Sequence, residues 1–220
     1  VQTAARTCEQ ETSAFATDLM LNRQLYDAIA AVKLDGLDAN TARFATLTLR
    51  DFRRAGVDKD EATRTRLKAI DEELTKLGQD FSKNIAGDVR AIEVDSADRL
   101  KGLPDDFIAA HQPGADGKIK ITTDYPDYLP FMTYAEDDGL KQELYVKFRS
   151  RGDAQNEKIL GDVLSLRSEK AMLLGFDNWA DYITEDKMIK SGKAASDFIE
   201  RVAKRLAVSH AFHSPRMQPM

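Results

Sequence analysis

The histidines are the residues whose type and spacing bear most directly on chemistry. There are three: His111, His210 and His213. A zinc hydrolase usually carries His-Glu-x-x-His, in which two imidazoles one helical turn apart bind the metal and the glutamate activates water. His210 and His213 are three residues apart without a glutamate between them, so a metal site there needs a third ligand from elsewhere. The simpler interpretation is a tail that contains histidines incidentally, and His111, in a predicted turn, is expected to be a solvated loop residue.

Motifs for nucleophilic catalysis and phosphate binding are missing. Neither Gly-x-Ser-x-Gly nor a Cys-His pairing occurs, which excludes the usual nucleophile elbows. The single cysteine, Cys8, excludes an intrachain disulfide and a cysteine-rich metal site, and we expect it to be a passive thiol. Gly192-Lys193 lacks both the upstream glycine and the following Ser or Thr of a phosphate-binding loop.

Six aromatic residues in the middle of the chain could line a peptide cleft: Tyr125, Tyr128, Phe131, Tyr134, Tyr145 and Phe148. Their three- and four-residue spacings are more typical of core packing than of a binding surface. We therefore expect them in the core. The charge runs at residues 50–54 and 58–66 are expected to be solvated helix faces.

The composition excludes several classes of protein. The 220 residues carry 32 Lys and Arg against 37 Asp and Glu, a net charge of -5, whereas a general nucleic-acid binder needs a basic surface. No run approaches the roughly 20 apolar residues of a membrane span. The start, Val1-Gln2-Thr3, lacks an initiator Met and the layout of a signal peptide, so we expect a piece of a longer protein or a processed product.

The dominant sequence period is helical. One long first helix is predicted by apolar residues at near three- and four-residue steps: Phe15, Leu19, Leu25, Ile29 and Val32. Asp38 is placed to cap a second helix that ends at Gly56. Asp58, with Glu61 three residues later, is predicted to open a third helix that Gly87 stops. The short connections predict an antiparallel helical bundle.

The middle of the chain follows a different period. Residues 89–94 and 118–122 alternate apolar and polar side chains, which predicts two half-buried strands. Between them Pro104 is expected to start a short helix and residues 111–114 to form a turn, while residues 125–130 are expected to be a proline-punctuated connector. Further helices are predicted at residues 137–150, 155–174, 179–188 and 194–205. The predicted fold class is mainly α, a helical bundle lobe with a small antiparallel β element near residues 89–123.

The last fifteen residues differ in composition from the rest of the chain. Residues 206–220 carry one charged side chain, Arg216, but two of the three histidines and two of the six prolines. We therefore predict a boundary after Arg205, with a helical part at residues 1–205 and an unrelated or poorly ordered tail at residues 206–220.

Six stretches together carry a family resemblance: Leu49–Gly56 (LRDFRRAG), Leu74–Ile85 (LTKLGQDFSKNI), Tyr125–Tyr128 (YPDY), Met132–Ala135 (MTYA), Lys170–Phe176 (KAMLLGF) and Trp179–Tyr182 (WADY). In order and spacing they resemble the thimet oligopeptidase family of zinc metallopeptidases, which includes oligopeptidase A and dipeptidyl carboxypeptidase. The resemblance covers about residues 1–205. It implies a mostly helical, two-lobed enzyme that cleaves short peptides in a deep channel.

The sequence differs from that family in the residues that bind zinc and catalyse hydrolysis. The family's His-Glu-x-x-His helix and third glutamate ligand lie downstream of the matched stretches and do not occur in this sequence. No catalytic or zinc-binding residue can therefore be assigned to any position. The resemblance implies a non-catalytic channel wall, with zinc as the cofactor of the complete enzyme only.

The tail resembles a second family. Val208–Met220 (VSHAFHSPRMQPM) is similar to the His-Ala-Phe-His segment of malonyl-selective acyltransferase domains in polyketide synthases. In that family the second histidine, here His213, is the base for a serine nucleophile, but the required Gly-His-Ser-x-Gly motif is missing. We therefore expect His213 to be catalytically silent and a fusion, frame error or designed chimera to account for the two resemblances.

Two functions of different classes follow from the sequence. The first is a channel-wall fragment of a cytoplasmic zinc oligopeptidase, whose complete form acts on short peptides. The second is a non-catalytic helical interaction module that self-associates through apolar surface. Neither hypothesis involves nucleic acid or a membrane.

Overall fold

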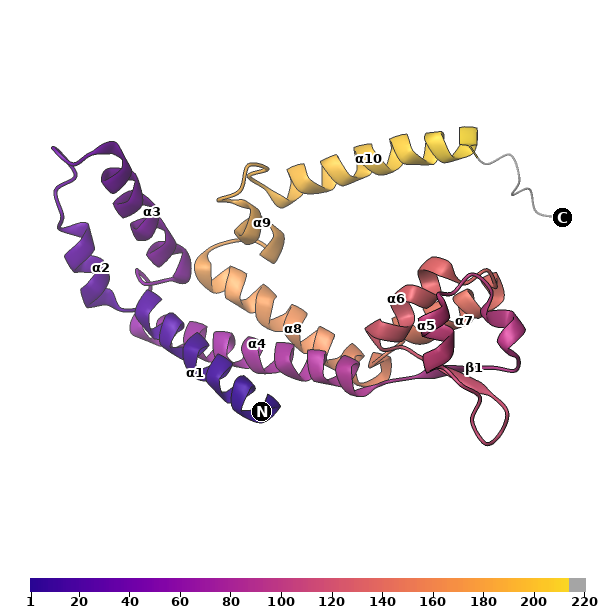
Figure 1. The fold of residues 1–220 in the computed structure, drawn as a ribbon. Helices are drawn as coiled ribbons and strands as arrows, with labels where there is room; N and C mark the ends of the chain where they lie inside the picture. The colour runs from indigo at the N-terminus through magenta and orange to yellow at the C-terminus, as the bar shows by residue number, and fades with distance from the viewer. Residues whose placement is uncertain (214–220) are drawn as a thin grey trace. The chain divides into compact units, whose positions relative to one another are not determined.

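A computed structural model describes the backbone of residues 1–213 and the side chains of residues 1–206. The chain forms two compact units: unit 1 comprises residues 1–75 and the chain from Val163 onward, and unit 2 comprises Lys76–Asp162. The described part of the chain is mainly helical with one two-stranded antiparallel sheet (Figure 1), which confirms the predicted fold class. None of the helices in the described part of the chain has the length and apolar character that a membrane crossing requires.

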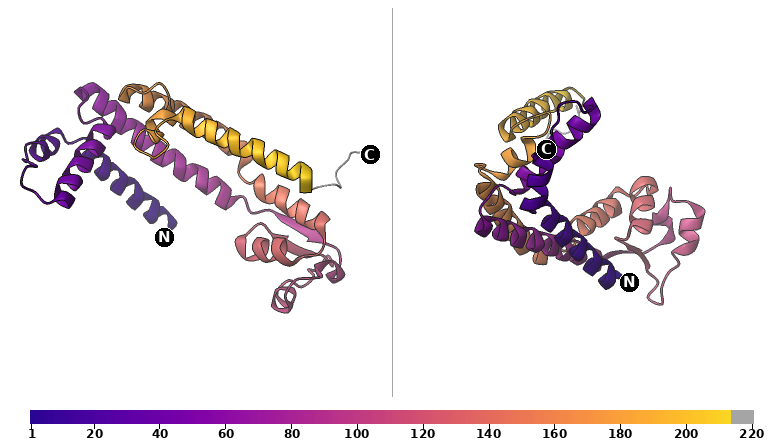
Figure 2. Two further views of the ribbon diagram at one scale, coloured as in Figure 1. Left: turned by 90° about the horizontal axis from the view of Figure 1, so that it is seen from above. Right: turned by 90° about the vertical axis from the view of Figure 1, so that its left-hand side faces the viewer.

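Unit 1 is built from helices. These are α1 (Gln2–Met20), α2 (Arg23–Ala30), α3 (Ala39–Ala55), the first part of α4 (Glu61–Gly87), the last part of α8 (Asp153–Leu174), α9 (Trp179–Thr184) and α10 (Gly192–His213). Both α1 and α2 contact α3, and α9 contacts α10 (Figure 2).

The prediction of one long first helix is wrong, because the chain leaves the helix at Leu21 and enters a second one at Arg23. The Asn22 side chain accepts a hydrogen bond from the Leu25 N–H at 2.9 Å and so caps α2. Asparagine favours this position because its side chain satisfies an N–H group of the first turn that has no partner within the helix. The apolar periodicity continues across the break and therefore conceals it.

The predicted ends of α3 are confirmed. The Asp38 carboxylate accepts hydrogen bonds from the N–H groups of Asn40 and Thr41, which caps the first turn. Gly56 ends the helix in the left-handed conformation, with φ of 99°. This is a backbone geometry that glycine adopts without steric cost.

The capping residue of α4 lies two residues later than the predicted opening at Asp58, and the helix itself begins at Glu61. Asp58 lies in a turn, closed by a hydrogen bond from the Lys59 N–H to the Gly56 carbonyl. Asp60 is the capping residue, and its carboxylate accepts from the Thr63 N–H at 2.7 Å. The prediction chose the wrong cap because two aspartates lie in the same short loop.

The core of unit 1 lies where α3, α4 and α8 meet. Its buried apolar residues are Phe52, Val57, Leu67, Ile70, Leu166, Ala171 and Leu174. Leu67 and Ile70 are fully buried, and each contributes roughly 2 kcal/mol through the apolar surface it removes from water. Helix α1 has no buried residue.

The last two helices differ in length from their predictions. Helix α9 ends at Thr184, four residues before the predicted end at Met188, and α10 continues to His213 instead of ending at Arg205. Residues 206–213 contain neither Gly nor Pro, so nothing in this stretch interrupts the helical backbone. The side chains of residues 207–213, which include His210 and His213, and all of residues 214–220 lie outside the described part of the chain.

Unit 2 surrounds the small sheet. Besides parts of α4 and α8 it contains β1 (Ala91–Val94), η1 (Ala97–Leu100), α5 (Asp105–Ala110), β2 (Ile119–Thr122), α6 (Tyr125–Tyr134) and α7 (Asp138–Arg149). The strands pair antiparallel with Ala91 opposite Thr122 and Val94 opposite Ile119, which confirms the predicted strand pair. The Lys147 ammonium joins α7 to the sheet by donating to the Ala91 carbonyl oxygen at 2.8 Å.

One face of the sheet and three helices form the core of unit 2. Its members are Ile92, Val94, Leu100, Leu103, Phe107, Ile119, Ile121, Tyr128, Phe131, Ala135, Leu140 and Leu144. The opposite face carries Glu93 and Lys120, which lie across from each other in the register. The alternation of buried and exposed positions that predicted the strands is the alternation of these two faces.

The predicted connector at residues 125–130 is wrong, because these residues form the first half of α6. Pro126 lies in the first turn, where a residue without an N–H loses no helical hydrogen bond. Pro130 lies within the helix, and its missing N–H leaves the carbonyl of residue 126 without a helical partner. The two prolines thus affect one turn of a helix instead of preventing it.

Candidate functional site

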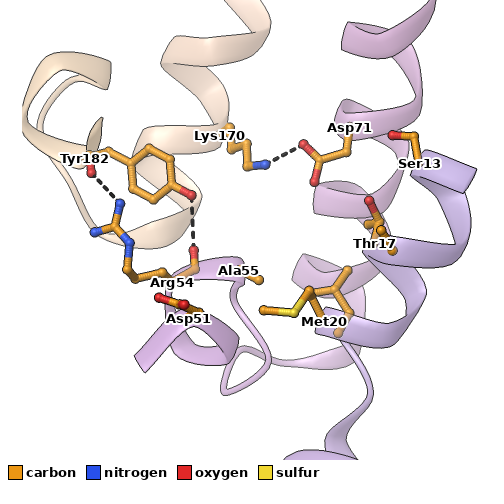
Figure 3. Close-up of a pocket in the computed structure, with 11 residues that line it drawn as sticks. Ser13, Thr17, Met20, Asp51, Arg54, Ala55, Asp71, Lys170 and Tyr182 are labelled. Atoms are coloured by element: carbon orange, nitrogen blue, oxygen red, sulfur yellow. Dashed lines mark hydrogen bonds and ion pairs between the residues drawn. The ribbon is translucent and has the colours of Figure 1, made fainter. Parts of the chain in front are cut away.

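A polar pocket in unit 1 brings together side chains from five helices (Figure 3). It holds about 370 Å³ and lies between α1, α3, α4, α8 and α9. The lining residues are Ser13, Ala16, Thr17, Met20, Leu21, Asp51, Arg54, Ala55, Asp71, Lys170 and Tyr182.

Asp71 and Lys170 form an ion pair across one side of this pocket (Figure 3). The Lys170 side chain is only 12% exposed, so its ammonium group depends on this carboxylate in place of water. On the same two helices, Arg66 of α4 donates two hydrogen bonds of 2.6 Å to Glu169 of α8. The bond from Arg66 lowers the pKa of Glu169. Two ion pairs therefore hold α4 against α8.

On the opposite side of the pocket, Arg54 of α3 binds the segment around α9. Its guanidinium lies 4.9 Å from the centroid of the Tyr182 ring and pairs with Glu185, with Asp186 at 3.6 Å. Burial raises the pKa of Tyr182, although the Arg54 charge opposes this shift. A hydrogen bond from Lys187, followed by the Arg54 charge, lowers the pKa of Asp186.

Helix α1 has no buried residue, so polar side chains connect it to the wall of the pocket. The Ser13 and Thr75 hydroxyl groups are 3.1 Å apart, and the Lys68 ammonium lies 2.5 Å from the Asp18 carboxylate. The hydrogen bond with Asp18 raises the pKa of Lys68. Both contacts join α1 to α4.

The pocket offers hydrogen bonds and charges but no catalytic pair. Its described lining contains neither histidine nor cysteine. The Tyr182 hydroxyl donates to the Arg54 carbonyl oxygen, and the Ser13 hydroxyl faces that of Thr75, so neither is paired with a base. This arrangement can fix helices and accept a polar group, and it supplies no activated nucleophile.

His111 is not the solvated loop residue that the sequence predicted. Its side chain is 16% exposed and its ring stacks on Phe107 with centroids 4.1 Å apart. Nδ1 lies 2.8 Å from the Phe107 carbonyl oxygen, and Nε2 lies 3.1 Å from the Asp127 carboxylate. The prediction failed because it considered only the nearby Pro113 and Gly114, not the side chains that α6 brings to the ring.

The predicted aromatic cluster is divided between core and surface. Tyr128 and Phe131 are buried and Phe148 packs against them, as core packing requires. Three other rings are exposed: Tyr125, Tyr134 and Tyr145. The expectation that these three belong to the core is wrong, because each lies on the outward side of its helix.

Cys8 and the charged runs complete the predicted candidates. Cys8 is a free, exposed thiol on α1. In the charge run at 50–54, Arg53 is exposed as expected, but the Arg54 side chain is only 15% exposed. Sequence reasoning therefore missed Arg54, together with Lys170 and Tyr182. The only feature of the sequence that could have indicated these three residues is that each lies in a stretch that carries the family resemblance.

The chain matches known proteins along most of its length. Residues 131–212 match the model of peptidase family M3. Oligopeptidase A of Haemophilus influenzae is 30% identical over 226 aligned residues, which cover 92% of this chain and 32% of the relative. The chain belongs to peptidase family M3.

Other M3 relatives show similar coverage. Oligopeptidase A of Escherichia coli is 32% identical over 71% of this chain and 25% of its own length. Saccharolysin of Saccharomyces cerevisiae is 27% identical over 86% of this chain and 28% of its own length. The M3 chain thus spans about a quarter to a third of the curated relatives it matches.

M3 peptidases are zinc enzymes, so the described residues can be tested for a zinc site. No group of three or more His, Cys, Asp or Glu side chains in the described part of the chain is arranged to hold a metal ion. His111, the one histidine whose side chain is described, is already bound to Phe107 and Asp127. The described residues therefore do not fit zinc.

Proposed function

We propose that this M3 chain is a channel-wall segment of a zinc-dependent oligopeptidase and carries no zinc site itself. The observation that supports it most is the match of 92% of the chain to about a third of an oligopeptidase A, in a sequence without His-Glu-x-x-His. The substrate class of the complete enzyme would be short peptides. The chain's own contribution is a rigid wall, in which paired charges keep five helices around one pocket.

A hydrolysis assay tests this proposal. The chain is incubated with an internally quenched peptide of about ten residues and with added zinc chloride, and an active oligopeptidase A relative serves as the positive control. We expect no fluorescence increase from the chain. Hydrolysis that a chelator abolishes would contradict the proposal, because it would require a metal site within this chain.

The reading frame beyond Arg205 in the parent gene provides a second test. If the chain is a segment of an oligopeptidase, the uninterrupted frame should encode a His-Glu-x-x-His helix downstream. A parent frame that continues into acyltransferase sequence instead would favour the chimera. We place the protein in the cytoplasm as part of this proposal, and the free thiol of Cys8 is compatible with a reducing compartment.

A helical interaction module is the second candidate function. It is favoured by α10, where four apolar side chains lie on one stripe and all are exposed: Phe198, Ile199, Val202 and Leu206. The expected partner is a second copy of the chain, since an uncovered stripe of this kind promotes self-association.

A further inference from the structure

Unit 2 carries aromatic rings and guanidinium groups next to one another on α6, α7 and the residues that follow α7. We call this surface the arginine–aromatic patch and define it as Tyr125, Tyr145, Phe148, Arg149 and Arg151. All five residues belong to unit 2, in which α6 contacts α7. None of its residues lines the pocket of unit 1.

Phe148 is the centre of the patch. One face of its ring stacks on the buried Tyr128, with centroids 3.8 Å apart and an interplanar angle of 13°. Tyr125 meets the same ring edge-on at 5.7 Å. Since Tyr128 occupies one face, the Arg151 guanidinium, 4.1 Å from the centroid, covers the other. The core therefore holds Phe148 and, through it, the position of Arg151.

A second ring and cation extend the patch along α7. Tyr145 lies one helical turn before Phe148, and the Arg149 guanidinium lies 5.2 Å from its ring centroid. Tyr125 is 60% exposed and Tyr145 is 44% exposed. Apolar ring surface and positive charge are thus both accessible from solvent.

The two arginines have no carboxylate partner among the described residues, unlike the other arginines of unit 2. Arg90 pairs with Asp88 and Arg99 pairs with Asp137, whereas no described carboxylate lies within 4.0 Å of Arg149 or Arg151. The Arg151 Nε donates to the Phe148 carbonyl oxygen at 3.3 Å, which orients the side chain and leaves both Nη groups available.

The charge of Arg151 acts on the nearby Asp88 carboxylate, but the two side chains do not form an ion pair. Its carboxylate is bound by Arg90 at 2.7 Å and by the Gly152 N–H at 2.8 Å. These hydrogen bonds, first that from Arg90, lower the pKa of Asp88, and the Arg151 charge adds to the effect. The Asp88 carboxylate therefore accepts hydrogen bonds from Arg90 and Gly152 and not from Arg151.

We propose that the arginine–aromatic patch binds the C-terminal carboxylate of a peptide whose last residue is aromatic or large and aliphatic. A guanidinium with free Nη donors binds a carboxylate through two parallel hydrogen bonds, and exposed rings beside it accept an apolar side chain. The net charge of -5 opposes polyanionic ligands such as nucleic acid, whereas a single carboxylate meets the local positive charge. The proposal goes beyond the proposed function, because this binding needs neither zinc nor hydrolysis.

Calorimetric titration with two peptides tests the patch. Acetyl-Ala-Ala-Phe with a free C-terminal carboxylate is compared with the same peptide ended by an amide, at low salt. We expect the acid to bind and the amide to bind about tenfold more weakly, because it lacks the charge-assisted hydrogen bonds. Arg151→Gln and Arg149→Gln should each weaken binding of the acid about tenfold and leave binding of the amide unchanged.

Arg201→Gln is the matched control, because Arg201 also lies over an exposed ring, Phe198 of α10, at 5.3 Å. It should bind the acid like the unchanged protein. Arg149 is exposed, so its variant keeps the test valid if Arg151→Gln impairs folding. Equal binding of acid and amide, no binding of either, or an equal loss in Arg201→Gln would overturn the proposal. None of these results would affect the channel-wall function, which the hydrolysis assay tests separately.

Discussion

Arg54 and Tyr182, 128 residues apart in the sequence, each bind the backbone of the other. The Arg54 guanidinium donates to the Tyr182 carbonyl oxygen at 2.9 Å, and the Tyr182 hydroxyl donates to the Arg54 carbonyl oxygen at 3.3 Å. Both groups lie in stretches that carry the family resemblance. These stretches therefore join α3 to α9, which gives them a structural role independent of zinc chemistry.

Removing either side chain should destabilise unit 1. Tyr182→Phe loses one hydrogen bond and should cost about 1 kcal/mol. Arg54→Met loses the hydrogen bond to the Tyr182 carbonyl and one of the cations near Asp186, which keeps its bond with Lys187, and should cost roughly 2 kcal/mol. Urea unfolding followed by the fluorescence of Trp179 measures this, since the single tryptophan lies in α9 with its ring 5.2 Å from Tyr182.

Arg53→Met is the control for the arginine substitution, because Arg53 is the exposed neighbour of Arg54 on α3. It should change the unfolding free energy by less than about 0.5 kcal/mol. Equal losses in Arg53→Met and Arg54→Met would mean that the mutual binding of Arg54 and Tyr182 does not stabilise unit 1.

Gly56 should tolerate no side chain. A Cβ there would lie 2.5 Å from Leu67 Cδ1 and 3.1 Å from Leu174 Cδ2, in a left-handed backbone with φ of 99°. Gly36 has a similar φ of 89°, but a Cβ added there would meet no atom within 4 Å, so Gly36→Ala measures the backbone strain alone. We expect Gly36→Ala to cost about 1 kcal/mol and Gly56→Ala about 3 kcal/mol in the same urea experiment. Equal costs would show that the core accommodates the added methyl group.

The sequence predicted correctly those helix ends and strands that are determined by residues close together in the chain. Asp38 and Gly56 fix the ends of α3 through their own side chain and backbone, and alternation predicted the strand pair of unit 2. The break at Asn22 was missed because the apolar period continues across it. Helix α6 was missed because its two prolines, one in the first turn and one within the helix, resemble those of a loop. In each missed case two local signals competed.

The candidate site could not be predicted in the same way, because its contacts are distant in sequence. Asp71 and Lys170 are 99 residues apart, and no spacing rule relates them. His111 was misassigned for the same reason, since its partner Asp127 is supplied by another helix. Family resemblance located the stretches that matter but not the pairs within them.

The Thr122–Asp127 contact should make unit 2 sensitive to acid. Burial disfavours the Asp127 carboxylate, but hydrogen bonds from the Thr122 hydroxyl and N–H and from His111 outweigh it and lower its pKa. Because the folded pKa lies below the unfolded value near ~3.9, the stabilisation is present above that pH and is lost as pH falls through the folded pKa. Thr122→Val should raise the pKa of Asp127 and move acid unfolding to higher pH.

Carboxyl resonances followed by NMR during acid titration measure both effects. Thr133→Val is the control, because the Thr133 hydroxyl bonds only within α6, to the Leu129 carbonyl oxygen at 2.7 Å. It should leave the Asp127 titration unchanged. An unaltered midpoint in Thr122→Val would show that the threonine does not hold the carboxylate in its charged form.

The apolar stripe of α10 should determine the oligomeric state. Ile199 is 65% exposed and Leu206 is 59% exposed, so a second copy that covered both would remove a large apolar area from water. We expect the mass from light scattering to rise with protein concentration, and Ile199→Glu combined with Leu206→Glu to keep the chain monomeric. Lys204→Glu is the control, because it changes the net charge by the same amount on the polar side of α10. The protein with this substitution should still associate. A strictly monomeric unchanged protein at high concentration would eliminate the interaction module and leave the channel-wall segment as the function.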